Sequence, residues 1–112
     1  MRILFDQGTP VPLRSYLASH SVDTTFERGW SDLKNSVLLE SAEQDGYHLL
    51  ITTDQNLRYQ QNLANRQLAV LVLLSTSWPR IQLRVDEVQV TVNEWWTGSV
   101  ADPLLIDDEG VF

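Results

Sequence analysis

Short apolar runs alternate along this chain with segments in which apolar residues recur every three or four positions. A run of four to seven residues that is apolar almost throughout is typical of a strand buried on both faces, as in a parallel sheet. Runs rich in β-branched residues favour the same structure. The pattern predicts four strands, at 2–5, 22–26, 47–52 and 68–74.

Two of the intervening segments have the start and stop signals of helices. Thr9 can cap a helix whose first turn holds two prolines, where a missing N–H is harmless, and this helix ends near His20. A second helix can be capped by Asn35 or Ser36, and the Asp-Gly pair at 45–46 stops it.

The segment after the fourth strand has two periodicities. Apolar residues from Ile81 to Trp95 follow at spacings of four, three, four and three, which is one helical face. The valines within 88–92 also alternate, as they would in a strand. We favour a helix because Pro79 suits its start and the helical series is longer. The chain then ends in an acidic tail at about 99–112, with a final short strand or hairpin as one alternative.

Strands that alternate with helices predict an α/β fold with a Rossmann-like, three-layer arrangement. We expect a central, mostly parallel sheet of four to five strands with helices on both faces. The 112 residues suit one domain over 1–112. The longest apolar run, 68–74, is far shorter than the ~20 residues of a membrane helix, so we expect a cytoplasmic protein without a membrane partner.

The amino-acid composition excludes several kinds of site and of binding function. Without cysteine the chain has no disulfide scaffold, no thiolate zinc site and no cysteine nucleophile. The net charge of -7 argues against broad binding of nucleic acid. However, residues 1–84 hold all eight basic residues and eight acidic ones, whereas residues 85–112 hold seven acidic residues and no basic ones. The surplus charge therefore belongs to the end of the chain, and a local nucleic-acid site is not excluded.

Two aspartates follow predicted strands. Asp6 comes after the first strand and Asp54 after the third. In an open parallel sheet, ligands bind outside the carboxyl ends of the strands, so both side chains should reach one crevice. Converging carboxylates suit Mg²⁺ or Mn²⁺ rather than zinc. The alternative is local: Asp6 could accept N–H bonds from the turn at Gly8, and Asp54 could cap a polar helix over 56–65.

That predicted polar helix is rich in amides and carries one arginine. Such side chains beside a metal site can hold phosphate oxygens or bases, and the candidates are Arg58, Gln60 and Gln61. The alternative is a solvated helix face. The two histidines, His20 and His48, match neither a metal-ligand spacing nor a nucleophile motif.

Several segments, taken together and in this order, resemble the short bacterial PIN-like proteins. These are relatives of the PIN-domain toxins of toxin–antitoxin operons, and the resemblance runs from Met1 to about Trp96. The matching segments are Ile3-Leu4-Phe5-Asp6-Gln7-Gly8-Thr9-Pro10, Glu27-Arg28-Gly29-Trp30, Leu33-Lys34-Asn35 with Leu38-Leu39, and Thr52-Thr53-Asp54-Gln55-Asn56-Leu57.

The resemblance implies a PIN-like fold and an Mg²⁺- or Mn²⁺-dependent ribonuclease site built from clustered acids. Asp6 matches the family's first acid, and Asp54 matches the acid after the third strand. It further implies RNA as substrate and, for a toxin, an antitoxin protein as partner. The adjacent Trp95 and Trp96 point some 100° apart on a helix, so one can be buried while the other forms a partner or homodimer surface.

The chain departs from the family where relatives often carry further acids. Asn35, Val37 and Asn56 occupy those positions. Asn35 and Asn56 could be metal ligands through an uncharged side-chain oxygen, although Asn35 suits a helix cap better. Glu40, further along the same helix, could substitute as a ligand or be plain surface. With so few acids the protein could be a weak or selective nuclease, or an inactive PIN-like module that binds a protein partner. A receiver domain also places aspartates at strand ends, but it normally needs a lysine after a late strand, and the only lysine here is Lys34.

Overall fold

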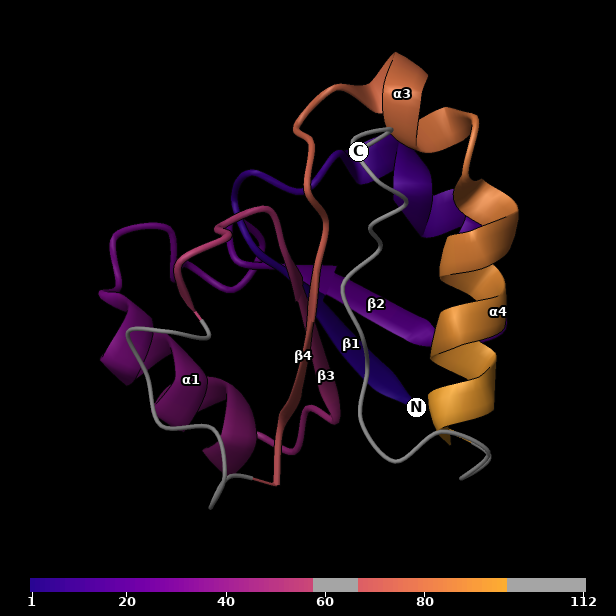
Figure 1. The fold of residues 1–112 in the computed structure, drawn as a ribbon. Helices are drawn as coiled ribbons and strands as arrows, with labels where there is room; N and C mark the ends of the chain where they lie inside the picture. The colour runs from indigo at the N-terminus through magenta and orange to yellow at the C-terminus, as the bar shows by residue number, and fades with distance from the viewer. Residues whose placement is uncertain (58–66, 97–112) are drawn as a thin grey trace.

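A four-stranded sheet forms the centre of the computed structural model, which describes residues 1–57 and 67–96. The sheet has the order β2-β1-β3-β4, and every pair of neighbouring strands is parallel. Its strands are β1 (Arg2–Phe5), β2 (Ser21–Thr24), β3 (Leu49–Thr52) and β4 (Ala69–Val72). This confirms the predicted α/β class and the parallel sheet, whose strands run side by side in Figure 1.

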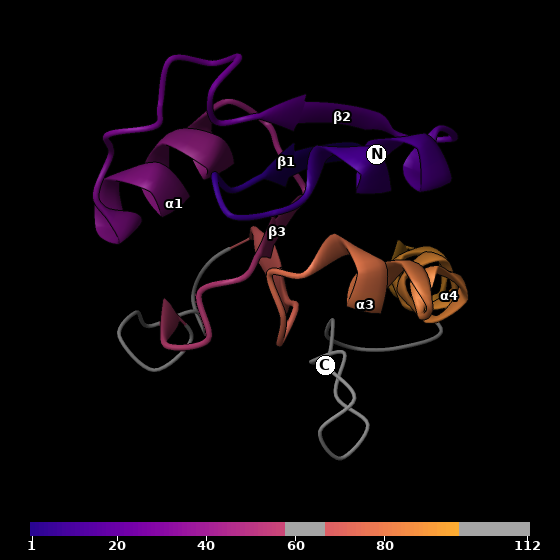
Figure 2. The same cartoon turned by 90° about the horizontal axis from the view of Figure 1, so that it is seen from above.

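Helices cover both faces of the sheet, as the sequence predicts. Helix α1 (Asn35–Gln44) lies on one face. The 3-10 helix η1 (Val11–Leu17) and the helices α3 (Trp78–Gln82) and α4 (Val85–Trp96) lie on the other. Figure 2 shows this division from above, with α1 apart from α3 and α4.

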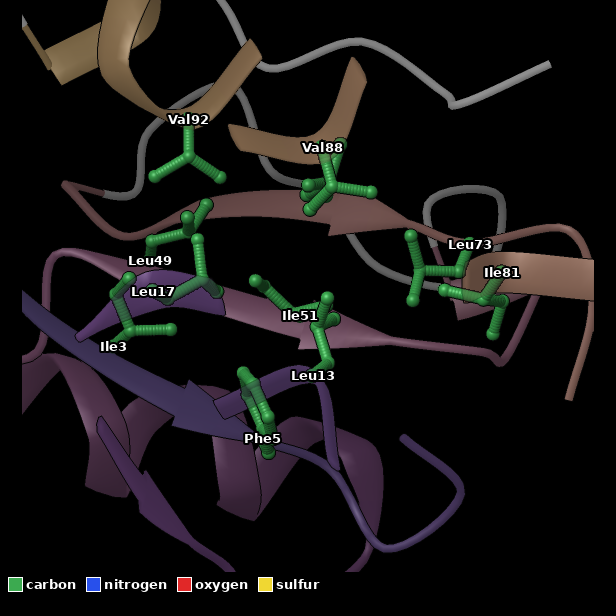
Figure 3. Close-up of a cluster of buried hydrophobic side chains, with 11 residues drawn as sticks. Ile3, Phe5, Leu13, Leu17, Leu49, Ile51, Leu73, Ile81, Val88 and Val92 are labelled. Atoms are coloured by element: carbon green, nitrogen blue, oxygen red, sulfur yellow. The ribbon is translucent and has the colours of Figure 1, made fainter. Parts of the chain in front are cut away.

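The two faces of the central strands build two separate cores, because successive side chains of a strand point to opposite faces. Ile3 and Phe5 of β1 pack with η1, α3 and α4, and Figure 3 shows this larger cluster. Leu4, between them, packs against the buried face of α1 with Leu50. All four residues of β3 are buried, which explains why that run is almost continuously apolar.

The segment at 81–92 is helical, so the preferred alternative is confirmed and the strand alternative is wrong. Pro79 lies in the first turn of α3, as predicted. The predicted single helix is nevertheless two helices. The Arg84 N–H donates to the Ile81 carbonyl at 2.8 Å, and this tighter turn leaves Leu83 82% exposed between α3 and α4.

Two further predictions need correction. Thr9 does not cap η1: its hydroxyl donates to the Ile51 carbonyl at 2.8 Å, and Pro10 holds the cap position. The predicted strand 22–26 ends at Thr24, because the chain then turns and the Trp30 N–H returns to the Thr25 carbonyl. Trp95 packs against the larger core while Trp96 is 47% exposed, so the predicted split between them is confirmed.

The predicted polar helix over 56–65 lies outside the described residues from position 58 onward. The tail 99–112, with its predicted strand or hairpin, also lies outside them.

Candidate functional site

The carboxyl ends of β1 and β3 bring the two predicted aspartates to the same edge of the sheet. Phe5 pairs with Ile51 in the parallel register, and the Asp6 N–H continues the ladder by donating to the Ile51 carbonyl at 2.9 Å. Asp6 is therefore beside Thr52, and Asp54 follows two residues later. Both aspartates are half-buried.

Thr52 connects the two aspartates. Its hydroxyl donates to Oδ2 of Asp6 at 2.6 Å and accepts the N–H of Asp54 at 3.0 Å. The Thr52 side chain is completely buried, so these hydrogen bonds do not compete with water. A buried hydroxyl that must donate in one direction and accept from the other fixes the position of both partners.

Asn35 adds a third side chain to this edge of the sheet. It is the first residue of α1, and its side-chain amide donates to Oδ2 of Asp54 at 3.1 Å. The prediction that Asn35 caps this helix is wrong: Lys34 holds the cap position, and its carbonyl accepts the Leu38 N–H at 2.8 Å. The start of α1 therefore holds a carboxylate that follows β3.

The second oxygen of each carboxylate accepts a backbone N–H. Oδ1 of Asp6 accepts from Gln7 at 2.6 Å, and Oδ1 of Asp54 accepts from Asn56 at 3.0 Å. The local alternative is thus partly right, although the donor beside Asp6 is Gln7 rather than Gly8. A carboxylate oxygen has two lone pairs, so each oxygen can still coordinate a cation.

Glycine is required at position 8 because the backbone there lies very close to the Thr53 side chain. A Cβ built at Gly8 would lie 2.3 Å from Oγ1 of Thr53, the residue between Thr52 and Asp54. A contact under about 3 Å cannot be accommodated without movement, so a larger residue at position 8 would push Thr53 aside. The absence of a side chain lets the turn after β1 pack against the end of β3.

The remaining predicted site residues do not join the pair. Glu40 is exposed and accepts a hydrogen bond from Gln44, one turn along α1. Asn56 contributes its backbone N–H, while its side chain is exposed. Within residues 1–57 and 67–96, no three acidic or histidine side chains are grouped so as to hold a metal ion. Arg58, Gln60 and Gln61 lie outside the described residues.

A cavity of about 360 Å³ opens beside Asp6, between the turn after β1 and the turn after β2. Among the residues that line it are Asp6, Gln7, Val11, Arg14, Phe26 and Glu27. Glu27 pairs with both terminal nitrogens of Arg14 and accepts the Thr24 N–H at 2.9 Å. The Arg14 hydrogen bond is the main reason that the pKa of Glu27 lies below its ordinary value.

Apart from the Arg14–Glu27 pair, a cluster of charged side chains surrounds Arg2 at the start of β1. Arg2 lies 3.8 Å from Asp23 and 3.5 Å from Asp45, and Arg28 lies 2.5 Å from Asp45. The Tyr47 hydroxyl donates to Asp23 at 2.5 Å, and the Arg2 guanidinium covers the Tyr47 ring. The Arg28 hydrogen bond lowers the pKa of Asp45. These contacts tie the end of α1 to the sheet, which is a structural role.

Sequence reasoning missed Thr52 and the side chains around the cavity. Thr52 carries a recognisable signal, a hydroxyl residue that ends an otherwise apolar strand. The cavity carries none, because the sequence predicts the segments that hold Arg14 and Phe26 but not that they and Glu27 line one cavity.

Comparisons with protein-family models, with curated proteins and with solved structures gave no match to this chain. Among the described residues, no helix has the length and apolar character that crossing a membrane requires. Any statement of function therefore depends on the site itself.

Proposed function

We propose that the protein is a metal-dependent ribonuclease of the PIN-like type, with Asp6 and Asp54 holding one Mg²⁺ or Mn²⁺ ion. One observation carries the proposal: two aspartates that follow separate strands are joined through the buried Thr52 hydroxyl, which donates to the Asp6 carboxylate and accepts the Asp54 backbone N–H. They lie at the edge where parallel sheets bind ligands. Hard oxygen donors suit these ions, and Mg²⁺ commonly uses only one or two protein carboxylates.

Two of the chain's residues would bind the ion, and two others would orient these ligands. Asp6 and Asp54 bind, Thr52 sets the position of Asp6, and the Asn35 amide sets the position of Asp54. A bound divalent ion supplies positive charge to a phosphate oxygen and acidifies a water nucleophile. In the hydrolysis a water oxygen would add to phosphorus and lose a proton to solvent, while the bond from phosphorus to the leaving ribose oxygen breaks and that oxygen takes up a proton from solvent.

The alternative is an inactive PIN-like module that binds a protein partner, with an antitoxin as the expected class. It is supported by the hydrogen bonds that each oxygen of Asp6 and Asp54 already accepts from the protein. It is also supported by the lack of a third acid beside them in the described part of the chain. On this alternative the carboxylates only fix two turns and the start of α1.

Thermal melting with added Mn²⁺ and cleavage of single-stranded RNA together separate the two functions. With a working site, the melting temperature should rise as Mn²⁺ is added. The corresponding gain in the free energy of unfolding is about 2.7 kcal/mol when the free Mn²⁺ concentration is a hundred times Kd. Asp6→Asn and Asp54→Asn should lose both this rise and the cleavage.

Asp32→Asn is the matched control, because Asp32 is an exposed acid in the loop before α1. It should keep the Mn²⁺ response and the cleavage of the parent protein. If the parent protein neither gains stability from Mn²⁺ or Mg²⁺ nor cleaves RNA, the nuclease proposal is wrong and the binding module is favoured. If Asp6→Asn cleaves as fast as the parent, the assignment of Asp6 is wrong.

A further inference from the structure

Two large apolar side chains are exposed at the cavity beside Asp6. Phe26 is 82% exposed and Val11 is 55% exposed, and both line this cavity together with Asp6. Single exposed apolar residues are ordinary on protein surfaces, but an exposed aromatic side chain beside a candidate phosphate-cleaving carboxylate is a ready stacking platform. Phe26 lies in the turn after β2, where it contributes to neither of the two cores.

The same cavity has a fixed polar wall. The Arg14 guanidinium and the Glu27 carboxylate pair with each other, and Glu27 and Thr24 exchange two backbone-to-side-chain hydrogen bonds at 2.9 and 3.1 Å. Arg14 presents N–H donors and Glu27 presents carboxylate acceptors, which are the groups that read the hydrogen-bonding edges of bases. The Nε of Arg14 is buried and has no partner among the described residues.

The size of the cavity restricts what it can hold. At about 360 Å³ it lies at the lower end of the range of small-ligand sites, roughly 300 to 1,000 Å³. A second cavity of about 440 Å³ shares Val11 and Arg14 with it and is lined by Tyr16 and Trp78, whose rings lie 5.9 Å apart. The two cavities are therefore neighbours on either side of shared lining residues, an arrangement that offers places for more than one nucleotide of a strand.

We propose that the cavity beside Asp6 takes one unpaired base of a single-stranded RNA, stacked on Phe26 with its edge toward Arg14 and Glu27. This inference rests on the proposed function and adds a base-binding site beside the proposed metal site. A base within a duplex is covered on both faces by its neighbours and uses its pairing edge, so it cannot enter the cavity without leaving the helix. The site therefore selects single strands over duplexes.

Fluorescence anisotropy with a short labelled single-stranded RNA tests the stacking contact. We would use Asp54→Asn as the background, because it removes a proposed catalytic acid that does not line the cavity. Adding Phe26→Ala should weaken binding about tenfold, as expected for losing one base–aromatic stack, whereas Phe26→Tyr should bind like the background. Leu83→Ala is the matched control, since Leu83 is also 82% exposed but lies between α3 and α4. It should leave the affinity unchanged.

A series of RNAs, each lacking one base, identifies the base concerned. At one position, the loss of binding free energy caused by removing the base and the loss caused by Phe26→Ala should not add up, because both changes remove the same stacking contact. Additive losses at every position, unchanged binding in Phe26→Ala, or equal binding of single-stranded and duplex RNA would each overturn the base site.

Cleavage by the parent protein separates this failure from that of the proposed function. If the parent cleaves RNA with Mn²⁺ but Phe26→Ala binds and cleaves equally well, only the base site is wrong. If the parent neither binds nor cleaves RNA, the proposed function is wrong and the base site is wrong with it.

Discussion

Replacement of Thr52 by valine tests the central link of the site, because valine keeps the shape of threonine and removes only the hydroxyl. Thr52 is completely buried, so no water replaces the lost hydrogen bonds. The change removes the 2.6 Å bond to the Asp6 carboxylate and leaves the Asp54 N–H without its 3.0 Å acceptor. A hydrogen bond to a charged group contributes about 1.5–3 kcal/mol, and an unsatisfied buried donor costs about 1–3 kcal/mol.

Since the two effects share one hydroxyl and Asp6 keeps the Gln7 N–H, we expect a net destabilisation of roughly 2–4 kcal/mol rather than the full sum. In a domain of this size that corresponds to a fall in melting temperature of roughly 8–17 °C. Urea denaturation measures the free energy of unfolding directly. The same variant should lose most of the Mn²⁺-induced rise in melting temperature, because Asp6 is no longer held in place.

Thr25→Val is the matched control for this prediction. Thr25 is also buried, at 1% exposure, but its hydroxyl has no hydrogen-bond partner among the described residues. Replacing an unpaired buried hydroxyl by a methyl group should be neutral or stabilising. If Thr52→Val and Thr25→Val change the free energy of unfolding equally, the reasoning about the Thr52 link is refuted.

Three other changes give distinct outcomes. Gly8→Ala should destabilise the fold by about 1–2 kcal/mol through its clash with the Thr53 hydroxyl, and adding Thr53→Ala should recover most of this loss in urea denaturation. Asn35→Asp places a second carboxylate against that of Asp54, whose Oδ2 now accepts the Asn35 amide at 3.1 Å. It should lower the melting temperature without metal and enlarge the rise in melting temperature caused by Mn²⁺. An unchanged response to Mn²⁺ would oppose a metal site. Arg28→Gln removes the partner that lowers the pKa of Asp45. A carboxyl with a lowered folded-state pKa contributes stability above its unfolded value of about 3.9 and loses it as the pH falls through the folded-state pKa. The stability gap between this variant and the parent should therefore be larger at neutral pH than below about pH 4, and a gap independent of pH would contradict the pairing.

Much of the fold could be predicted from the sequence because its signals are local. The first strand is found where it was predicted, at Arg2–Phe5, and the buried character of β3 follows from its apolar run. The helical face from Ile81 onward outweighed the alternation of its valines. Boundaries that depend on longer-range contacts were less predictable: Thr9 has a better partner in the Ile51 carbonyl than in its own helix. The predicted strand through Phe26 stops at Thr24 because the turn returns to Thr25.

The candidate site likewise has features that the sequence predicts and features that depend on the tertiary structure. The sequence by itself determined that Asp6 and Asp54 share an edge, because parallel strands joined by right-handed crossovers present their carboxyl ends together. Only the tertiary structure decided that Thr52 joins them and that Asn35 holds Asp54 instead of capping its helix. Only the structure also decided that Phe26 and Arg14 line one cavity with Asp6. Strand periodicity is a property of neighbouring residues, whereas these contacts join residues far apart in the chain and depend on how the turns pack.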